Sequence, residues 1–133
     1  GDPRIYFVGG LRDERPGYYA HSTVYACPTT KASFGITLLE AMACATPIVC
    51  SDIAGFHDVV RDEREALFVG SGDAGALALA LGRVLDDDAL RGRLSAAGLA
   101  HVAEYAWPRV TDQVLALYHE VLGRSAPAVG TEP

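Results

Sequence analysis

The chain has 133 residues, half of them hydrophobic, so it is long enough to bury the core of one domain. Its formal net charge of −6 argues against nucleic acid as a partner, because proteins that bind nucleic acid carry a basic surface. The three cysteines lie inside apolar runs and are expected to be reduced, which is typical of a cytoplasmic protein and argues against a disulfide framework. No secretory leader or membrane-spanning stretch is recognisable in the sequence.

The first predicted element is a short strand that ends in glycines, Arg4–Gly10. Gly9 and Gly10 follow its carboxyl end, which is where α/β sheets bind ligands. From the residues alone an ordinary strand-to-helix turn is the better interpretation, since the dinucleotide fingerprint G-x-G-x-x-G is missing. Residues 11–22 are predicted to form a poor helix that Pro16 interrupts.

The second predicted strand, Thr23–Cys27, leads into the stretch around which the chain is organised. Residues 32–45 run from a loop into an almost wholly apolar helix, which stops before Pro47. Glu40 is the only charged residue of that stretch. Spacing alone leaves two interpretations open. Either Glu40 faces a ligand-binding cleft, or its side chain is simply exposed to water on an otherwise buried strand–loop–helix unit.

The start of this helix suits a nucleotide. The backbone amides of Gly35, Ile36 and Thr37 lack partners inside the helix and favour an anion, so they are expected to hold a diphosphate. Thr37 and Glu40 share a helix face, and an ionised carboxylate accepts hydrogen bonds from a vicinal diol such as a ribose. This interpretation needs Glu40 to be open to a ligand, and an arginine bound to it elsewhere in the fold would contradict it.

Alternating strands and helices follow, and then helices alone. Strands are predicted over 48–51 and 66–69, separated by a short helix from His57 to about Arg61. Three helices are predicted after them: Gly75–Leu85, Ala89–Tyr105, and Trp107 to about Leu122. Asp73 is expected to cap the first of the three, and the aspartates of the run 86–88 to serve the second as caps and not as metal ligands. The order predicts an α/β fold with a four-stranded, Rossmann-like parallel sheet covered by helices on both faces.

Several runs in the chain carry a family resemblance. Ser33–Ile36 (SFGI), Leu38–Ala43 (LLEAMA), Pro47–Asp52 and Trp107 resemble the signature region of retaining glycosyltransferases with two Rossmann-like domains, known as glycosyltransferase group 1, family 4, or the GT-B fold. Phosphatidylinositol mannosyltransferases are the most similar members. The resemblance implies that residues 1–124 are the carboxyl-terminal part of a nucleotide-sugar-binding domain from a longer enzyme, followed by a disordered tail over 125–133.

The resemblance also implies an activity. The full-length protein would transfer a hexose from a nucleotide-diphosphate sugar to an unknown acceptor with retention of anomeric configuration, and this chain alone would be inactive. GDP-mannose is the favoured donor, and UDP-glucose stays open. The implied partners are that donor and a missing amino-terminal acceptor domain. The resemblance is also compatible with peripheral contact between that missing domain and a membrane. No cofactor, metal or catalytic nucleophile is implied.

Carried over residue by residue, the resemblance implies one set of donor-binding residues: Ser33, Phe34, Gly35, Ile36, Thr37 and Glu40. It also places the nucleotide base near Gly9 and Gly10. The family's first glutamate, which reaches the donor sugar, falls at position 32, where this chain has Ala32. Because alanine cannot hydrogen-bond through its side chain, the alternative is a nucleotide-binding module or inactive fragment without turnover.

Overall fold

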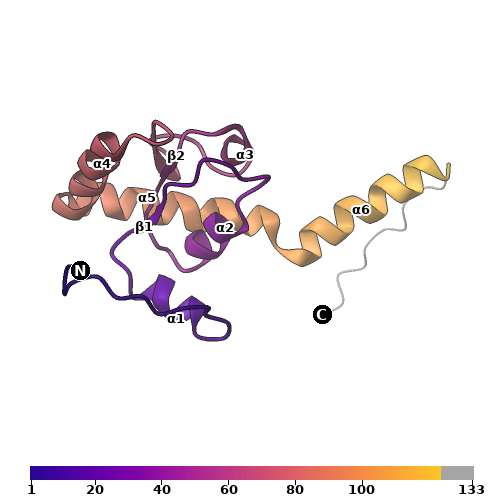
Figure 1. Cartoon of the computed structure of the whole chain (residues 1–133). Coiled ribbons are helices and arrows are strands. Elements are labelled where there is room, and N and C mark those ends of the chain that lie inside the picture. The colour runs from indigo at the N-terminus through magenta and orange to yellow at the C-terminus, as the bar shows by residue number, and fades with distance from the viewer. Residues whose placement is uncertain (124–133) are drawn as a thin grey trace.

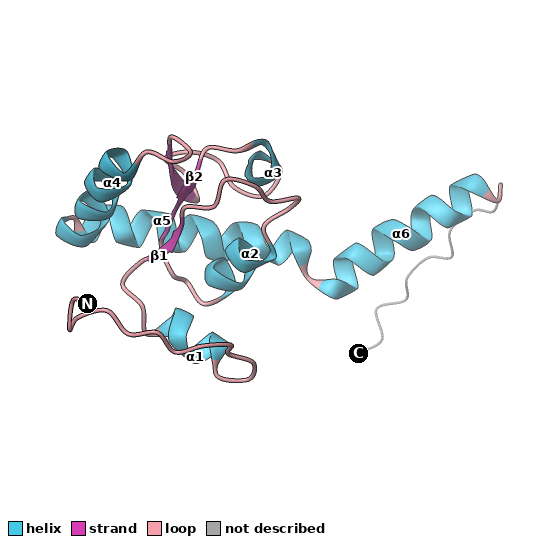
Figure 2. Ribbon diagram, viewed as in Figure 1, coloured by secondary structure: helices cyan, strands magenta, loops and turns pink. Residues whose placement is uncertain are grey.

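Three parallel strands form the sheet of the computed structural model, which describes residues 1–123. They are β1 (Tyr25–Cys27), β2 (Ile48–Ser51) and β3 (Ala66–Val69), in the order β1-β2-β3. Figure 2 draws the strands in magenta and labels β1 and β2. The prediction is confirmed for β2 and β3, whereas β1 starts two residues later than predicted. The tail predicted over 125–133 lies outside the described residues.

Helices cover the sheet on both faces, as predicted. Successive side chains of β2 point to opposite faces, so Ile48 and Cys50 join one buried cluster and Val49 joins another. The first cluster includes Leu38 of α2 (Ile36–Ala43), and the second includes Val84 of α4 (Ala74–Asp86). α5 (Asp88–Val102) packs against both α2 and α4. The core is therefore two apolar layers separated by a short, fully buried central strand.

The two aspartate caps are confirmed. Asp73 accepts a hydrogen bond from the amide of Ala76 at 2.8 Å and so begins α4. Asp87 accepts one from the amide of Leu90 at 2.8 Å and begins α5. Among the described residues no group of three or more histidine, cysteine, aspartate or glutamate side chains is placed to hold a metal ion.

The strand predicted over Arg4–Gly10 is wrong. The segment is irregular and exposed, with Ile5 62% and Phe7 97% accessible. A strand needs a neighbour to complete its backbone hydrogen bonds, and within residues 1–123 β1 pairs only with β2. The sheet of the described chain therefore has three strands and not four.

Three helix predictions need correction. α1 (Arg15–Ala20) includes Pro16 in its first turn, where the missing amide costs nothing, so this proline starts the helix and does not interrupt it. α3 (Ala54–His57) begins earlier than predicted because its turn carries Phe56 into the core. The helix predicted to run to Tyr105 ends as a 3₁₀ turn, η1 (Ala103–Tyr105).

The last helix, α6 (Trp107–Val121), extends away from the rest of the molecule (Figure 1). The sequence predicts an apolar side for it, and this side is present but exposed: no residue of α6 is buried, and Leu117 and Val121 are 56% and 75% accessible. No helix within residues 1–123 is long and apolar enough to cross a membrane.

Candidate functional site

The carboxyl ends of the three strands lead into loops at one edge of the sheet. Residues 28–35 follow β1, residues 52–53 follow β2, and residues 70–73 follow β3. This edge is where parallel α/β sheets bind ligands. The first loop ends at Gly35, so the start of α2 lies at this edge.

Gly35 is required by its own backbone conformation. Its φ of +92° and ψ of 49° lie in the left-handed region. A side chain there would also meet the Phe56 ring at 2.9 Å and Leu38 at 3.2 Å. No described side chain caps α2 at Gly35, so the first amides of the helix, those of Ile36 and Thr37, can bind an anion.

One turn further along α2, Glu40 lines a cavity of about 290 Å³. Its Oε2 accepts hydrogen bonds from Arg15 Nη1 at 3.1 Å and from the Tyr19 hydroxyl at 3.2 Å. The cavity is lined by Arg12, Arg15, Pro16, Tyr19, Glu40, Ala43 and Cys44. This arginine contact is the outcome named above as contradicting an open Glu40, so the expectation of a wholly free carboxylate is wrong, and only the part of the side chain that Arg15 and Tyr19 leave unbound can serve a ligand. The Glu40 side chain nevertheless remains 33% exposed, and Oε1 has no hydrogen-bond partner among the described residues.

A second cavity, of about 470 Å³, surrounds the position where the resemblance expects a glutamate. It is lined by Thr30, Lys31, Ala32, Ser33, Ile53, Ala54 and Gly55. Gly55 is packed so tightly on this loop that a Cβ would lie 2.0 Å from the carbonyl oxygen of Ala32. Lys31 is the only charged residue in the lining, so this cavity offers no carboxylate to a sugar.

The other residues predicted to bind the donor lie in different surroundings. Phe34 packs edge-on against Tyr105 with ring centroids 6.0 Å apart, so its ring is partly engaged within the protein. Ser33 and Ile36 are exposed at the start of α2, and Thr37 is half-buried. These residues stay together on one loop and helix.

The two glycines predicted to lie at the nucleotide base do not follow a strand. Gly9 has a φ of +72°, and a Cβ at Gly9 or Gly10 would meet nothing within 4 Å. Both are exposed. The two glycines thus lie within an irregular, exposed segment, and no described contact joins them to Glu40.

Sequence reasoning missed Arg15 and Tyr19, which hold Glu40. They precede Glu40 by 25 and 21 residues, and no local pattern links two such distant positions. Elsewhere at this edge, Asp52 and His57 form a pair, with their Oδ1 and Nε2 atoms 2.6 Å apart. The His57 ring stacks on Phe68 with centroids 5.2 Å apart.

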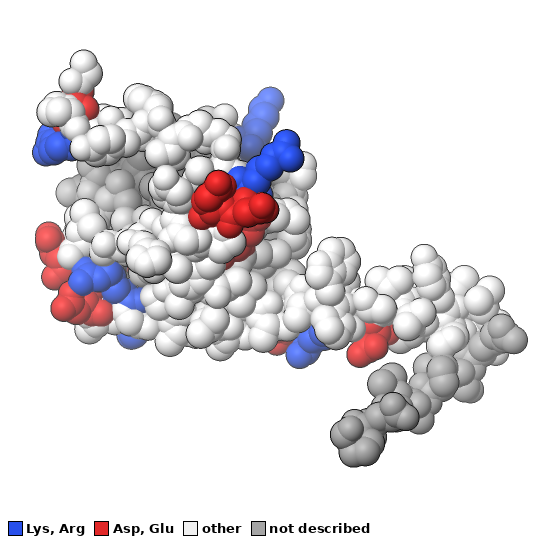
Figure 3. Space-filling model, turned by 90° about the horizontal axis from the view of Figure 1, so that it is seen from below, with Lys and Arg blue, Asp and Glu red and all other residues white. Residues whose placement is uncertain are grey.

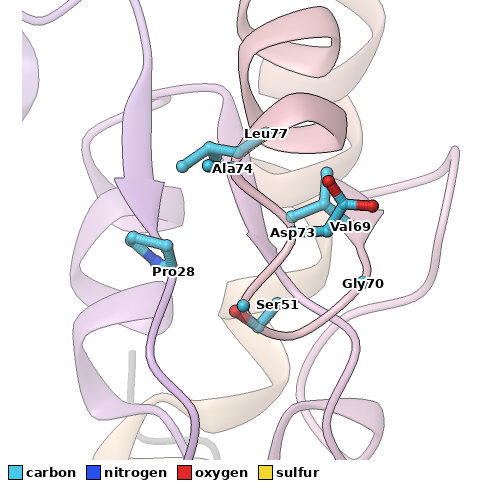
Figure 4. Close-up of a pocket in the computed structure, with 8 residues that line it drawn as sticks. Pro28, Ser51, Val69, Gly70, Asp73, Ala74 and Leu77 are labelled. Carbon is cyan, nitrogen blue, oxygen red and sulfur yellow. The ribbon is translucent and has the colours of Figure 1, made fainter.

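A third cavity, of about 140 Å³, lies between the strand ends and the start of α4 (Figure 4). Ser51, Val69 and Leu77 contribute to its lining, and Asp73 lies beside Gly70 at its edge. Because the Asp73 carboxylate already caps α4, this small cavity has little polar chemistry to offer a ligand.

Comparisons with known proteins show the family of this chain. Residues 1–87 match the family model described as glycosyl transferases group 1. A phosphatidyl-myo-inositol mannosyltransferase of Mycobacterium leprae (strain TN) is 41% identical over 119 residues, which cover 88% of this chain and 32% of that protein. The chain therefore belongs to the group 1 glycosyltransferase family.

Solved structures show the same fold. The sucrose-phosphate synthase of Thermosynechococcus elongatus aligns with a TM-score of 0.82 at 35% identity, over 92% of this chain and 31% of that chain. The Anabaena protein HepE, solved in complex with UDP and glucose, aligns with a TM-score of 0.76 at 23% identity, over 92% of this chain and 32% of that one. The chain thus spans about a third of the length of these relatives and is a partial domain of a GT-B glycosyltransferase, which confirms the predicted fold class.

Proposed function

We propose that this chain is the donor-binding part of a retaining glycosyltransferase that uses a nucleotide-diphosphate sugar. The observation that carries the proposal is the arrangement on α2: uncapped amides at its start, and one turn later a half-exposed carboxylate with one oxygen open to a ligand. An anion-binding helix start followed by an acceptor for hydroxyl groups matches a diphosphate joined to a ribose.

The relatives support a nucleotide sugar as donor. HepE was solved with UDP and glucose, and the Mycobacterium leprae relative is a mannosyltransferase. We favour GDP-mannose on the second of these similarities, with UDP-glucose as the other candidate. The acceptor, in this proposal, is held by an amino-terminal domain outside this chain, in a cytoplasmic enzyme that contacts the membrane only through that domain.

In the proposed reaction the described residues bind and orient the donor, and none acts as a nucleophile. The amides of Ile36 and Thr37 stabilise the negative charge that builds on the leaving diphosphate, an electrostatic contribution of the kind that commonly lowers enzymatic barriers. Glu40 holds the ribose, which fixes the diphosphate relative to the helix start. The chain by itself is expected to bind the donor nucleotide without turnover.

Nucleotide binding is tested by calorimetry with GDP, UDP and ADP on the wild-type protein and on Glu40→Ala. We expect Glu40→Ala to weaken binding of the preferred nucleotide about tenfold or more, because a hydrogen bond to a charged group is lost. Glu63→Ala is the matched control, since Glu63 also pairs with an arginine, Arg83, at 3.0 Å but lies outside the cavity. Unchanged affinity in Glu40→Ala, or equal losses in both variants, would contradict the proposal.

A nucleotide-binding module without turnover is the second candidate, and Ala32 favours it. Ala32 lines a cavity of about 470 Å³ and also packs against the first buried cluster. We therefore expect Ala32→Glu in the full-length enzyme to raise the rate of sugar transfer from GDP-mannose by about tenfold, through a new hydrogen bond to the sugar. If transfer is absent in both forms while GDP still binds, the module is the correct function and the enzymatic proposal is wrong.

A further inference from the structure

Helix α1 brings two hydrogen-bond donors to a single oxygen of Glu40. Arg15 and Tyr19 are four residues apart and so lie on the same face of α1, the face that packs against α2. Both donate to Oε2. A carboxylate oxygen has two lone pairs, so these two donors occupy Oε2 and leave both acceptor positions of Oε1 to a ligand.

The Tyr19 hydroxyl is held in place by the core. Tyr19 is only 8% exposed, and its ring packs edge-on against that of Tyr25, with centroids 5.2 Å apart. Its backbone carbonyl accepts a hydrogen bond from Thr46 Oγ1 at 2.8 Å, which ties α1 to the end of α2. Burial raises the pKa of Tyr19, and the neighbouring Tyr25 and Glu40 raise it further, so the hydroxyl keeps its proton and donates.

The pair of Arg15 and Glu40 contributes little to folding stability, because the two side chains are 43% and 33% exposed and water screens their attraction. An ordered carboxylate has a different benefit: a side chain already fixed by two donors loses less freedom when a ligand binds. The geometry points to Arg15 and Tyr19 as positioning residues that aim Oε1 of Glu40 at the ribose hydroxyl groups of the donor. This inference rests on the proposed function.

Arg15 could either position Glu40 for the ribose or compete with the ribose for Glu40, and these two roles predict opposite changes in nucleotide affinity when Arg15 is replaced. If Arg15 holds Glu40 ready for a ribose, removing the guanidinium weakens binding of a ribonucleotide. If Arg15 instead occupies Glu40 in place of the ligand, removing it strengthens that binding. The ratio of the affinities for a ribonucleotide and its 2′-deoxy analogue reports on the ribose alone, so it separates either effect from a general loss of structure.

The test is calorimetry with GDP and 2′-deoxy-GDP, comparing the ratio of the two affinities among variants. We expect Arg15→Gln and Tyr19→Phe each to reduce the preference for GDP by about threefold, the effect of one hydrogen bond. Arg15→Lys, which keeps a donor and a charge, is expected to restore part of the preference. Arg12→Gln is the matched control, because Arg12 lines the same cavity and makes no described bond to Glu40. It should lower both affinities in equal proportion and leave the ratio unchanged.

Two outcomes would overturn the inference: an unchanged ratio in both Arg15→Gln and Tyr19→Phe, or tighter GDP binding in Arg15→Gln. Glu40→Ala separates this failure from failure of the proposed function. If Glu40→Ala abolishes the preference for GDP while the α1 variants keep it, only the positioning role is wrong. If Glu40→Ala also keeps the preference, the ribose does not bind at Glu40 and the proposed function fails with it.

Discussion

Glu65 is the most deeply buried charge among the described residues, with a side chain only 1% exposed. Arg61 donates to it three times: from its backbone amide at 3.0 Å, from Nε at 3.1 Å and from Nη2 at 2.6 Å. Burial alone would raise the pKa of Glu65, but the hydrogen bonds and charge of Arg61 outweigh it, so the pKa is lowered. The carboxylate is therefore part of the folded structure in its ionised form.

This lowered pKa predicts a dependence of stability on pH. A carboxyl group whose folded pKa lies below its unfolded value of 4.5 stabilises the fold fully above that value, and the contribution is lost as the pH falls through the folded pKa. We expect Glu65→Gln to lower the free energy of unfolding by about 1–3 kcal/mol at neutral pH. The difference from wild type should shrink in acid, as measured by urea unfolding across a pH series.

Glu63→Gln provides the control for this measurement. Glu63 pairs with Arg83, but the two side chains are 52% and 56% exposed. Its loss should change the free energy of unfolding by less than about 0.5 kcal/mol. A Glu65→Gln difference that stays constant from neutral to acid pH would show that the ionised carboxylate contributes nothing specific.

At the scale of the element, α2 carries the site and has an unusual residue at its carboxyl end. Ala45 has a φ of +56°, the left-handed region that favours glycine. The conformation closes the helix, because the amide of Ala45 bonds to the carbonyl of Met42 and that of Thr46 to Ala41, both at 2.9 Å. An alanine side chain in this conformation costs roughly 1–2 kcal/mol.

Relieving this strain should stabilise the protein. We expect Ala45→Gly to raise the free energy of unfolding by about 0.5–1 kcal/mol, once the greater freedom of glycine in the unfolded chain is subtracted. Ala96→Gly is the matched control: the same change in the middle of α5, at an exposed position, should lower stability by about 1 kcal/mol. Thermal or urea unfolding of both variants tests this, and a loss of stability in Ala45→Gly would contradict the account of the helix end.

Elements that carry their own signal could be predicted from the sequence. The short β-branched and apolar runs of β2 and β3 indicate buried strands by their own composition. Asp73 caps its helix through a hydrogen bond to a residue three positions further along the chain. The strand over 4–10 failed because a strand depends on a partner as well as on its own residues. The helix predicted from His57 failed because the position of Phe56 in the core decides where that turn begins.

The same limit applies to the candidate site. Gly35 and Glu40 could be found because they lie on one loop and helix with a recognisable spacing. Arg15 and Tyr19 could not, since only the packing of α1 on α2 brings them to Glu40.

At the scale of the whole molecule, charge and exposed apolar surface are unevenly distributed. In the view of Figure 3, acidic and basic side chains lie together in small groups, and most of the surface between them is uncharged. The apolar side chains of residues 5–8 and of α6 are exposed. Under the proposed function, a molecule with a net charge of −6 would have to bind a diphosphate against its overall charge, so the local groups at the start of α2 would supply the attraction.

The most direct test of the central claim is a crystal structure of the protein with GDP. We expect the diphosphate to accept hydrogen bonds from the amides of Ile36 and Thr37, and the ribose hydroxyl groups to donate to Oε1 of Glu40 while Arg15 and Tyr19 stay on Oε2. GDP bound away from α2, with Glu40 bonded only to Arg15 and Tyr19, would contradict the account.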